Sequence, residues 1–239
     1  MSNPYQAPLD AENNSNQLNS GHQYSAAEIS QLYRCRMGAG LLLFVLCLVI
    51  IAFICGVLQL NTASFLKVII GISILAAICS FIGNVMLLFS PERSGAKELF
   101  MFSFFLGIIA GVAPSILSFM DVPIATSLIA NLILAILPLF CLIVFLTAWC
   151  NLGLFINSYD VYRKMKRART AFCCTLLLPL LGFILSKIPG LVGSNNVLGI
   201  ILVGSVLLGA VISLIVFVIN YGNGLTSFRK AVYEMMLKN

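Results

Sequence analysis

The stretch from residue 37 to residue 60 reads MGAGLLLFVLCLVIIAFICGVLQL and contains no charged residue. An α-helix needs about 20 apolar residues to cross a bilayer core, so this stretch is long enough to span a membrane. Five further apolar runs of comparable length follow it. Across the whole chain 60% of the residues are apolar and only 9% are charged, whereas about a quarter of the residues of a soluble domain are charged. The composition excludes a soluble globular domain and predicts a multi-pass membrane protein.

The predicted fold is an all-α, polytopic membrane helix bundle with six transmembrane helices. A Lys, Arg or Asp at the centre of a span costs about 2.5 to 3.5 kcal/mol on insertion scales. All 14 basic and 8 acidic residues avoid the centres of the six apolar runs, which supports this segmentation. The predicted spans are residues 37–60, 68–89, 99–120, 124–149, 171–188 and 197–221.

The residues before the first span are expected to divide into a tail and a short helix. Residues 1–24 are rich in Asn, Gln and Ser and carry no Lys or Arg, a composition that cannot bury a hydrophobic core. We expect them to form a disordered tail. Ser25 and Glu28 have the spacing of a capping box, so a juxtamembrane helix is expected over residues 25–36.

The distribution of basic residues predicts the orientation of the chain. Of the 14 Lys and Arg residues, 12 lie before the first span, in the loops after the second and fourth spans, or after the sixth span, and only Lys67 and Lys187 lie on the other side. Cytoplasmic loops carry the excess of Lys and Arg, so both termini are predicted to be cytoplasmic. Trp149, Tyr33 and Tyr221 lie at the predicted inner ends of spans, at the headgroup depth that amphipathic rings prefer. The net charge of +6 is therefore interpreted as a topology signal, and no nucleic-acid partner is expected.

Two amphipathic segments are predicted on the cytoplasmic side of the transmembrane domain, which covers residues 37–221. Residues 151–169 are interpreted as a helix with an apolar half and a basic half, and residues 222–239 as a C-terminal helix with an apolar stripe. Such helices lie on an anionic leaflet, pair with each other or dock a partner protein. The candidate contact residues are Phe155, Tyr159, Tyr162, Arg163, Lys164, Arg167, Phe228, Val232 and Met235.

The residue types used in catalysis are almost missing from the apolar runs. The single histidine, His22, lies in the polar tail, and Asp121 stands alone at a predicted outer turn. A nucleophile needs a neighbouring base, and a catalytic carboxylate needs a second acid or a metal ion. The sequence therefore predicts a protein that is not an enzyme and that uses no cofactor or metal.

The eight cysteines all lie in a predicted span or at its edge, and none forms a CxxC pair. Disulfides need oxidised loops and zinc needs clustered thiolates, so the cysteines are expected to be reduced packing residues. Cys35, between Arg34 and Arg36, is the exception, because a juxtamembrane cysteine beside cations is also a candidate for acylation.

Neutral polar and helix-breaking residues inside the spans leave passive transport open as an alternative. Broken helices can line a path for a small neutral solute or a lipid, but Asn and Pro also serve as ordinary packing and interhelical hydrogen-bonding residues. Gly107 and Gly111 form a GxxxG pair that permits close helix contact, within the bundle or between copies. The candidate pathway residues are Asn84, Asn131, Pro114, Pro138 and Pro179.

The N-terminal sequence NPYQAP at residues 3–8, followed by a polar tail and several apolar spans, resembles the start of uncharacterised multi-pass membrane proteins of planctomycete bacteria. The loop SPERSGAK at residues 90–97 is similar in style to a loop in some of them. The resemblance implies a bacterial cytoplasmic (inner) membrane and assigns no functional residues.

From the sequence we expect a non-catalytic scaffold or complex subunit, whose contacts are the lipid bilayer and a protein partner or a second copy. Self-association would use the cytoplasmic helices or the Gly107 and Gly111 pair. The alternative is a passive transporter or channel for a small neutral solute or lipid. The two functions differ in the bundle interior, because a scaffold can be packed solid whereas a transporter needs a cavity where Asn84, Asn131 and the broken helices converge.

The charge bias predicts that reporter domains fused before residue 1 and after residue 239 are both active on the cytoplasmic side only, because Lys-rich and Arg-rich loops stay on that side of the membrane. Activity of the two fusions in intact cells measures this. A terminus accessible from outside would contradict the six-span topology and the side assigned to every loop.

Overall fold

The computed structural model describes residues 24–57, 63–119, 124–186 and 197–238. Within these ranges it describes the backbone alone at residues 56–57, 63–66, 113–119, 124–135, 182–186, 197–200 and 202–203. All regular structure in the described ranges is helical, which confirms the predicted all-α class. The elements are α2 (Ala26–Val57), α3 (Ala63–Leu87), the short 3₁₀ helix η2 (Glu92–Ser94), α4 (Ala96–Phe119), α5 (Ile124–Phe155), α6 (Tyr159–Ser186) and α7 (Val197–Lys238).

Four of these helices contain a stretch that is long and apolar enough to cross a membrane. The stretches are Ala26–Cys55 in α2, Lys67–Leu87 in α3, Ile136–Phe155 in α5 and Gly204–Lys238 in α7. The predicted third and fifth spans fall on α4 and α6, and neither helix has such a stretch among its described side chains. The chain is therefore an all-helical protein with several helices that can span a membrane.

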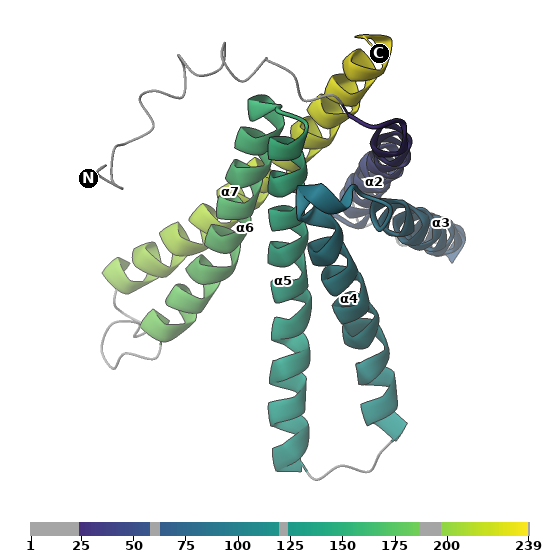
Figure 1. Ribbon diagram of the computed structural model, residues 1–239. Helices are drawn as coiled ribbons and strands as arrows, with labels where there is room; N and C mark the ends of the chain where they lie inside the picture. Colours follow the sequence, from purple (N-terminus) through teal and green to yellow (C-terminus); the bar gives the residue numbers. More distant parts are fainter. Residues whose placement is uncertain (1–23, 58–62, 120–123, 187–196, 239) are drawn as a thin grey trace, which may run out of the picture.

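The six α-helices form three hairpins, α2–α3, α4–α5 and α6–α7 (Figure 1). The hairpins meet at one end of the molecule and diverge in three directions from it. We call this end the apex; it comprises residues 24–42, 87–100, 145–172 and 221–238. Between hairpins, α5 packs against α6 and α2 packs against α7, whereas α3 and α4 barely touch. The apex therefore holds the three hairpins together.

The hydrophobic core lies in the apex around Trp149 of α5, which is fully buried. The centroid of its ring lies 5.5 Å from that of Phe100 in α4 and 5.1 Å from that of Phe228 in α7, both in edge-on geometry. Away from the apex, the arms of the hairpins expose large apolar side chains such as Phe53 and Phe105. This contrast is expected if the apex packs as a protein interior while the arms face lipid.

Two aromatic residues predicted at the headgroup level belong to this core instead. Trp149 has no exposed surface and Tyr221 is 9% exposed, whereas Tyr33 is about half exposed. An aromatic ring at the inner end of a span fits the same sequence pattern whether it faces lipid headgroups or a neighbouring helix. The prediction that Trp149 and Tyr221 face lipid headgroups is therefore wrong, because both side chains pack inside the apex.

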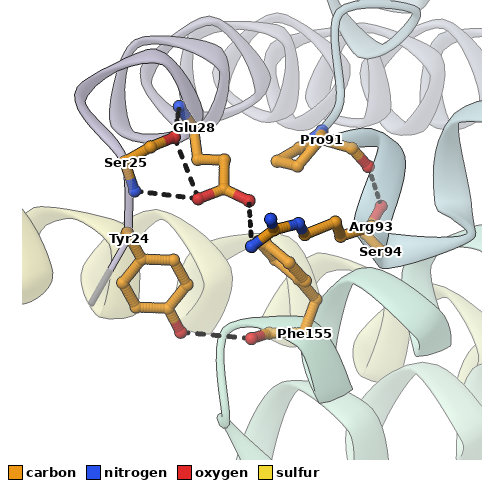
Figure 2. Close-up of polar contacts among 7 residues, drawn as sticks. All are labelled: Tyr24, Ser25, Glu28, Pro91, Arg93, Ser94 and Phe155. Carbon is orange, nitrogen blue, oxygen red and sulfur yellow. Dashed lines mark hydrogen bonds and ion pairs between the residues drawn. The ribbon is translucent and has the colours of Figure 1, made fainter. Parts of the chain in front are cut away.

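The capping box predicted at Ser25 and Glu28 is confirmed: Ser25 directly precedes α2, and Glu28 lies in its first turn (Figure 2). The N–H of Ser25 donates to Glu28 Oε2 at 2.8 Å, and the N–H of Glu28 donates to Ser25 Oγ at 3.2 Å. This reciprocal pair satisfies two N–H groups that would otherwise lack partners. The expected helix at residues 25–36 and the predicted first span, as far as residue 57, form one continuous helix, and α7 likewise joins the predicted sixth span to residues 222–238.

Contacts beside the capping box attach the start of α2 to the end of α5 and to η2 (Figure 2). The hydroxyl of Tyr24 donates to the carbonyl oxygen of Phe155 at the end of α5, at 3.1 Å, and the two rings meet edge-on. Arg93 in η2 lies 3.9 Å from the Glu28 carboxylate. The first hairpin is thereby fixed to the second near the surface of the apex.

Residues 151–169 do not form the single amphipathic helix that the sequence predicted, because a turn separates α5 from α6 within this segment. Asn157 has a φ of 53°. Its N–H donates to the carbonyl of Leu154 at 3.0 Å, and the N–H of Ser158 donates to the carbonyl of Gly153 at 2.9 Å. These two bonds form a Schellman motif, which ends a helix with a left-handed residue, and Asn tolerates that conformation. The helical wheel was wrong because it assumed one axis across the turn.

Glycine allows close backbone approach at two packed positions. A Cβ on Gly38 of α2 would lie 2.8 Å from the carbonyl oxygen of Gly83 in α3, and a Cβ on Gly153 would lie 2.9 Å from the backbone nitrogen of Tyr162. Neither neighbour can move without shifting a helix. These glycines therefore set the separation of α2 from α3 and the tightness of the α5–α6 turn.

Replacing Phe228 by Ala should lower the free energy of unfolding by about 3 to 5 kcal/mol, because the ring is fully buried against Trp149 and its removal leaves a cavity. Thermal unfolding of the purified chain in detergent, followed by circular dichroism, measures the change. Leu237→Ala in the same helix is the control, since Leu237 is 70% exposed, and it should shift stability by less than about 0.5 kcal/mol. Equal effects of the two substitutions would contradict the position of the core.

Candidate functional site

A crevice of about 810 Å³ lies between the α2–α3 and α4–α5 hairpins, where α3 and α4 diverge. It is open on one side and its walls are mostly apolar. Phe145 of α5 and Tyr221 of α7 lie at its apex end. Polar side chains in its lining include Ser80, Asn84 and Ser103. The crevice is thus an opening in the bundle at the level of the predicted spans.

The structure brings two of the five predicted pathway residues to this crevice. Asn84 of α3 and Pro138 of α5 both line it, whereas Pro179 is exposed on α6 and does not. Pro114 and Asn131 fall on α4 and α5, and their side chains lie outside the described ones. Two of the candidates therefore share one cavity, which the sequence alone did not establish.

The side chain of Asn84 bonds within its own helix. Its Nδ2 donates to the carbonyl oxygen of Ser80 at 2.8 Å and lies 3.4 Å from Ser80 Oγ. The expectation of an interhelical bond is wrong for this residue within the described part of the chain. Asn84 instead uses the acceptors of the preceding turn of its own helix.

The polar connection across the crevice wall is made by Ser103 of α4 and Cys141 of α5. Ser103 Oγ donates to the carbonyl of Cys141 at 3.1 Å, and Cys141 Sγ donates to the carbonyl of Ser103 at 2.9 Å. Sequence reasoning missed this pair. Ser103 precedes Gly107 and Gly111 by four and eight residues, so an extended pattern of small residues was the available signal.

Among the described residues, the GxxxG pair makes no contact between helices as close as that of Gly38. Gly107 and Gly111 both line the crevice. Of the side chains that the structure describes, a Cβ on Gly107 would meet only Cys141 Sγ at 3.6 Å, and a Cβ on Gly111 would meet none within 4 Å. A small-residue face of α4 is therefore open to the crevice, in contrast to the tightly packed Gly38.

The apolar stripe of the C-terminal segment packs inside the protein. Phe228 and Val232 are fully buried in the apex core, and Met235 packs partly against it. The prediction that Phe228 and Val232 contact the membrane surface or a partner is therefore corrected. Their partners are α5 and α6 of the same chain, because Val161 and Met165 of α6 are buried in the same cluster.

The predicted contact residues at the α5–α6 turn face different surroundings. Phe155 is partly buried against Tyr24. Tyr159 is exposed and Tyr162 is partly buried, and their ring centroids lie 6.0 Å apart. Arg163 and Arg167 are exposed on α6.

Lysines bind two of the acidic side chains in the apex. Lys164 Nζ donates to Asp160 Oδ2 at 2.7 Å and to Ser227 Oγ of α7 at 2.8 Å. Lys97 Nζ donates to Glu92 Oε1 at 2.6 Å. Each bond stabilises the charged carboxylate, and it holds the pKa of Asp160 and of Glu92 below its ordinary value.

All eight cysteines are free thiols in the structure. Cys35 is fully buried in the apex, which contradicts the accessible juxtamembrane thiol that acylation requires. Among the side chains that the structure describes, no three His, Cys, Asp or Glu residues lie close enough to hold a metal ion.

No protein-family model, curated protein or solved structure matches this chain.

Replacing Ser103 by Ala should lower the free energy of unfolding by about 0.6 kcal/mol, the average value of a hydrogen bond between membrane helices. Ser73→Ala in α3 is the matched control, because Ser73 Oγ donates only to the carbonyl of Ile69 in its own helix. Thermal unfolding of both variants in detergent measures the difference. A larger loss for Ser73→Ala than for Ser103→Ala would show that the Ser103 bond does not hold α4 to α5.

Proposed function

We propose that the protein is a non-catalytic scaffold or complex subunit of the bacterial inner membrane, with six transmembrane helices and both termini in the cytoplasm. Twelve of the 14 Lys and Arg residues lie in segments that belong to the apex. Lys67 lies near the start of α3, at the end of that helix that points away from the apex. This arrangement supports one cytoplasmic face for the apex. The N-terminal resemblance supports the inner membrane.

The observation that carries the scaffold function is the unused small-residue face of α4. Gly107 and Gly111 line an apolar crevice, and among the described side chains a Cβ on Gly107 would meet Cys141 Sγ alone while a Cβ on Gly111 would meet none within 4 Å. In membranes, such faces let the backbone of a second helix approach closely. Association of helices in a membrane depends on this close packing, because lipid is as apolar as Leu and burying apolar surface between helices gains little. We infer that a transmembrane helix of a partner subunit or of a second copy lies in the crevice.

Passive movement of a lipid or small neutral solute is the second candidate. It is favoured by the shared position of Asn84 and Pro138 on the wall of one cavity. Because the crevice is open on its side rather than enclosed, a lipid could enter it directly from the bilayer. This alternative needs a polar path that continues beyond the crevice, and the polar groups that line it are few.

A catalytic role is not proposed. Ser80, Asn84 and Ser103 in the crevice lining are neutral, and the carboxylates of Glu92 and Asp160 are bound to lysines in the apex. The residues that could activate a nucleophile and those that line the crevice therefore belong to different parts of the described structure.

Replacing Gly111 by Leu should fill the crevice and release the partner helix without destabilising the chain, because a Cβ at this position meets none of the described side chains within 4 Å. Gly71→Leu is the matched control, since Gly71 of α3 has equally open surroundings and does not line the crevice. Native gel electrophoresis of membranes solubilised in mild detergent measures the size of the complex. We expect a shift to the monomer for Gly111→Leu alone, with melting temperatures of both variants unchanged.

Flux through liposomes distinguishes the two candidates. If complexes of Gly111→Leu and Gly71→Leu migrate alike, and if Asn84→Leu abolishes a selective flux of lipid or solute, the transporter function replaces the scaffold function. A scaffold predicts no selective flux for the unmodified chain or for Asn84→Leu.

A further inference from the structure

A second hollow of about 570 Å³ lies between α6 and α7, and we call it the α6–α7 groove. The two helices run antiparallel, as shown by Lys164 bonding to Ser227 near the apex and by the Phe172 ring lying 5.3 Å from the Phe217 ring farther along. Positions deeper in the arm therefore have higher numbers on α6 and lower numbers on α7. This order places the lining residues along the length of the groove.

The groove changes in character along its length. The lining residues nearest the apex are Tyr159, Tyr162, Arg163, Lys166 and Arg167. Thr170 of α6 and Asn220 of α7 follow. The lining residues farthest from the apex include Cys174, Ile212 and Val216. One end is cationic, a narrow polar zone comes next, and the other end is largely apolar.

The three cations lie on one face of α6, because residues 163, 166 and 167 are spaced by three and four positions. Within the described part of the chain none of them takes part in an ion pair. Their neighbour Lys164 differs, since it is bound to Asp160. Lys166 is held over the ring of Tyr162, with its Nζ 5.7 Å from the ring centroid. Three positive charges are therefore concentrated in one groove, and the Asp160 carboxylate, which interacts electrostatically with Arg163, is itself bound by Lys164.

We propose that the α6–α7 groove binds one anionic phospholipid of the inner leaflet. The phosphate lies among Arg163, Lys166 and Arg167, and an acyl chain runs over Cys174 and Ile212. Basic pockets between transmembrane helices on the cytoplasmic side bind acidic lipid headgroups in this manner. This site is separate from the crevice, which lies between the other two hairpins.

The polarity gradient favours a lipid over other anions. A free phosphate would use only the cationic end and would leave the apolar end empty. An acidic peptide would need the groove to stay outside the membrane, whereas residues 174, 212 and 216 fall within the predicted fifth and sixth spans. The inference rests on the proposed membrane placement of α6 and α7, and it does not depend on a partner helix in the crevice.

The test is the retention of lipid by the full-length chain in detergent, measured by native mass spectrometry after addition of equal amounts of phosphatidylglycerol and phosphatidylcholine. We expect one phosphatidylglycerol to be retained in preference to phosphatidylcholine. Each basic residue near an anionic headgroup contributes about fivefold in affinity, so Arg163→Gln combined with Arg167→Gln should weaken retention about 25-fold. Lys230→Gln combined with Lys238→Gln is the control, because it removes the same charge from α7 outside the groove.

A second variant tests the apolar end of the groove. Cys174→Phe adds bulk there without changing any charge and should also reduce retention of phosphatidylglycerol. Cys47→Phe is its control, because Cys47 is equally exposed but lies on α2. Melting temperatures show whether each variant is folded, and reduced retention by a folded groove variant supports the site.

Three outcomes would overturn the proposal. Equal retention of the two lipids by the unmodified chain would show that the headgroup is not recognised. Equal losses in the two double variants would show that net charge alone attracts the lipid. Displacement of phosphatidylglycerol by excess inorganic phosphate would show that the groove takes a free anion instead. None of these outcomes depends on the complex that Gly111→Leu is designed to disrupt.

Discussion

The edge-on packing of Trp149 against Phe100 and Phe228 is the contact on which the rest of the structure depends. It joins α5 to α4 and to α7, and it lies where all three hairpins meet. Helices in lipid gain little from burying apolar surface against each other, because lipid is as apolar as their side chains. The hairpins can therefore diverge beyond the apex at little cost, provided that the apex is packed as tightly as a soluble core. The crevice and the α6–α7 groove both follow from this division between a packed end and open arms.

Much of the fold could be predicted from the sequence, because the signals involved are local. The uncharged runs predicted where the helices lie, and the spacing of Ser25 and Glu28 predicted the start of α2 to within one residue. The prediction of one helix over residues 151–169 was wrong because Asn157 adopts a left-handed conformation and the chain reverses there. The amino-acid composition does not change at this turn, so the composition could not reveal it. A glycine or proline would have signalled the turn more strongly than Asn does.

The candidate sites were only partly predictable, because they depend on how hairpins separate. The sequence singled out Asn84 and Pro138, but only the divergence of α3 from α4 brings them to one cavity. The basic residues of α6 were identified from a wheel that spanned the wrong segment, and Arg163 and Arg167 nevertheless proved to share one face. Phe228 and Val232 were assigned to a surface, since an amphipathic stripe looks the same whether it meets a membrane or another helix of the chain.

The continuity of α7 has a mechanical consequence. With 42 residues in a single helix and a rise of 1.5 Å per residue, α7 is about 63 Å long, roughly twice the thickness of the hydrocarbon core. Its residues 222–238 extend about 25 Å beyond the predicted sixth span. Phe228 and Val232 bury this extension in the apex, so a change in its direction would disturb the core around Trp149. The uninterrupted helix therefore couples the direction of its arm to the packing of the apex.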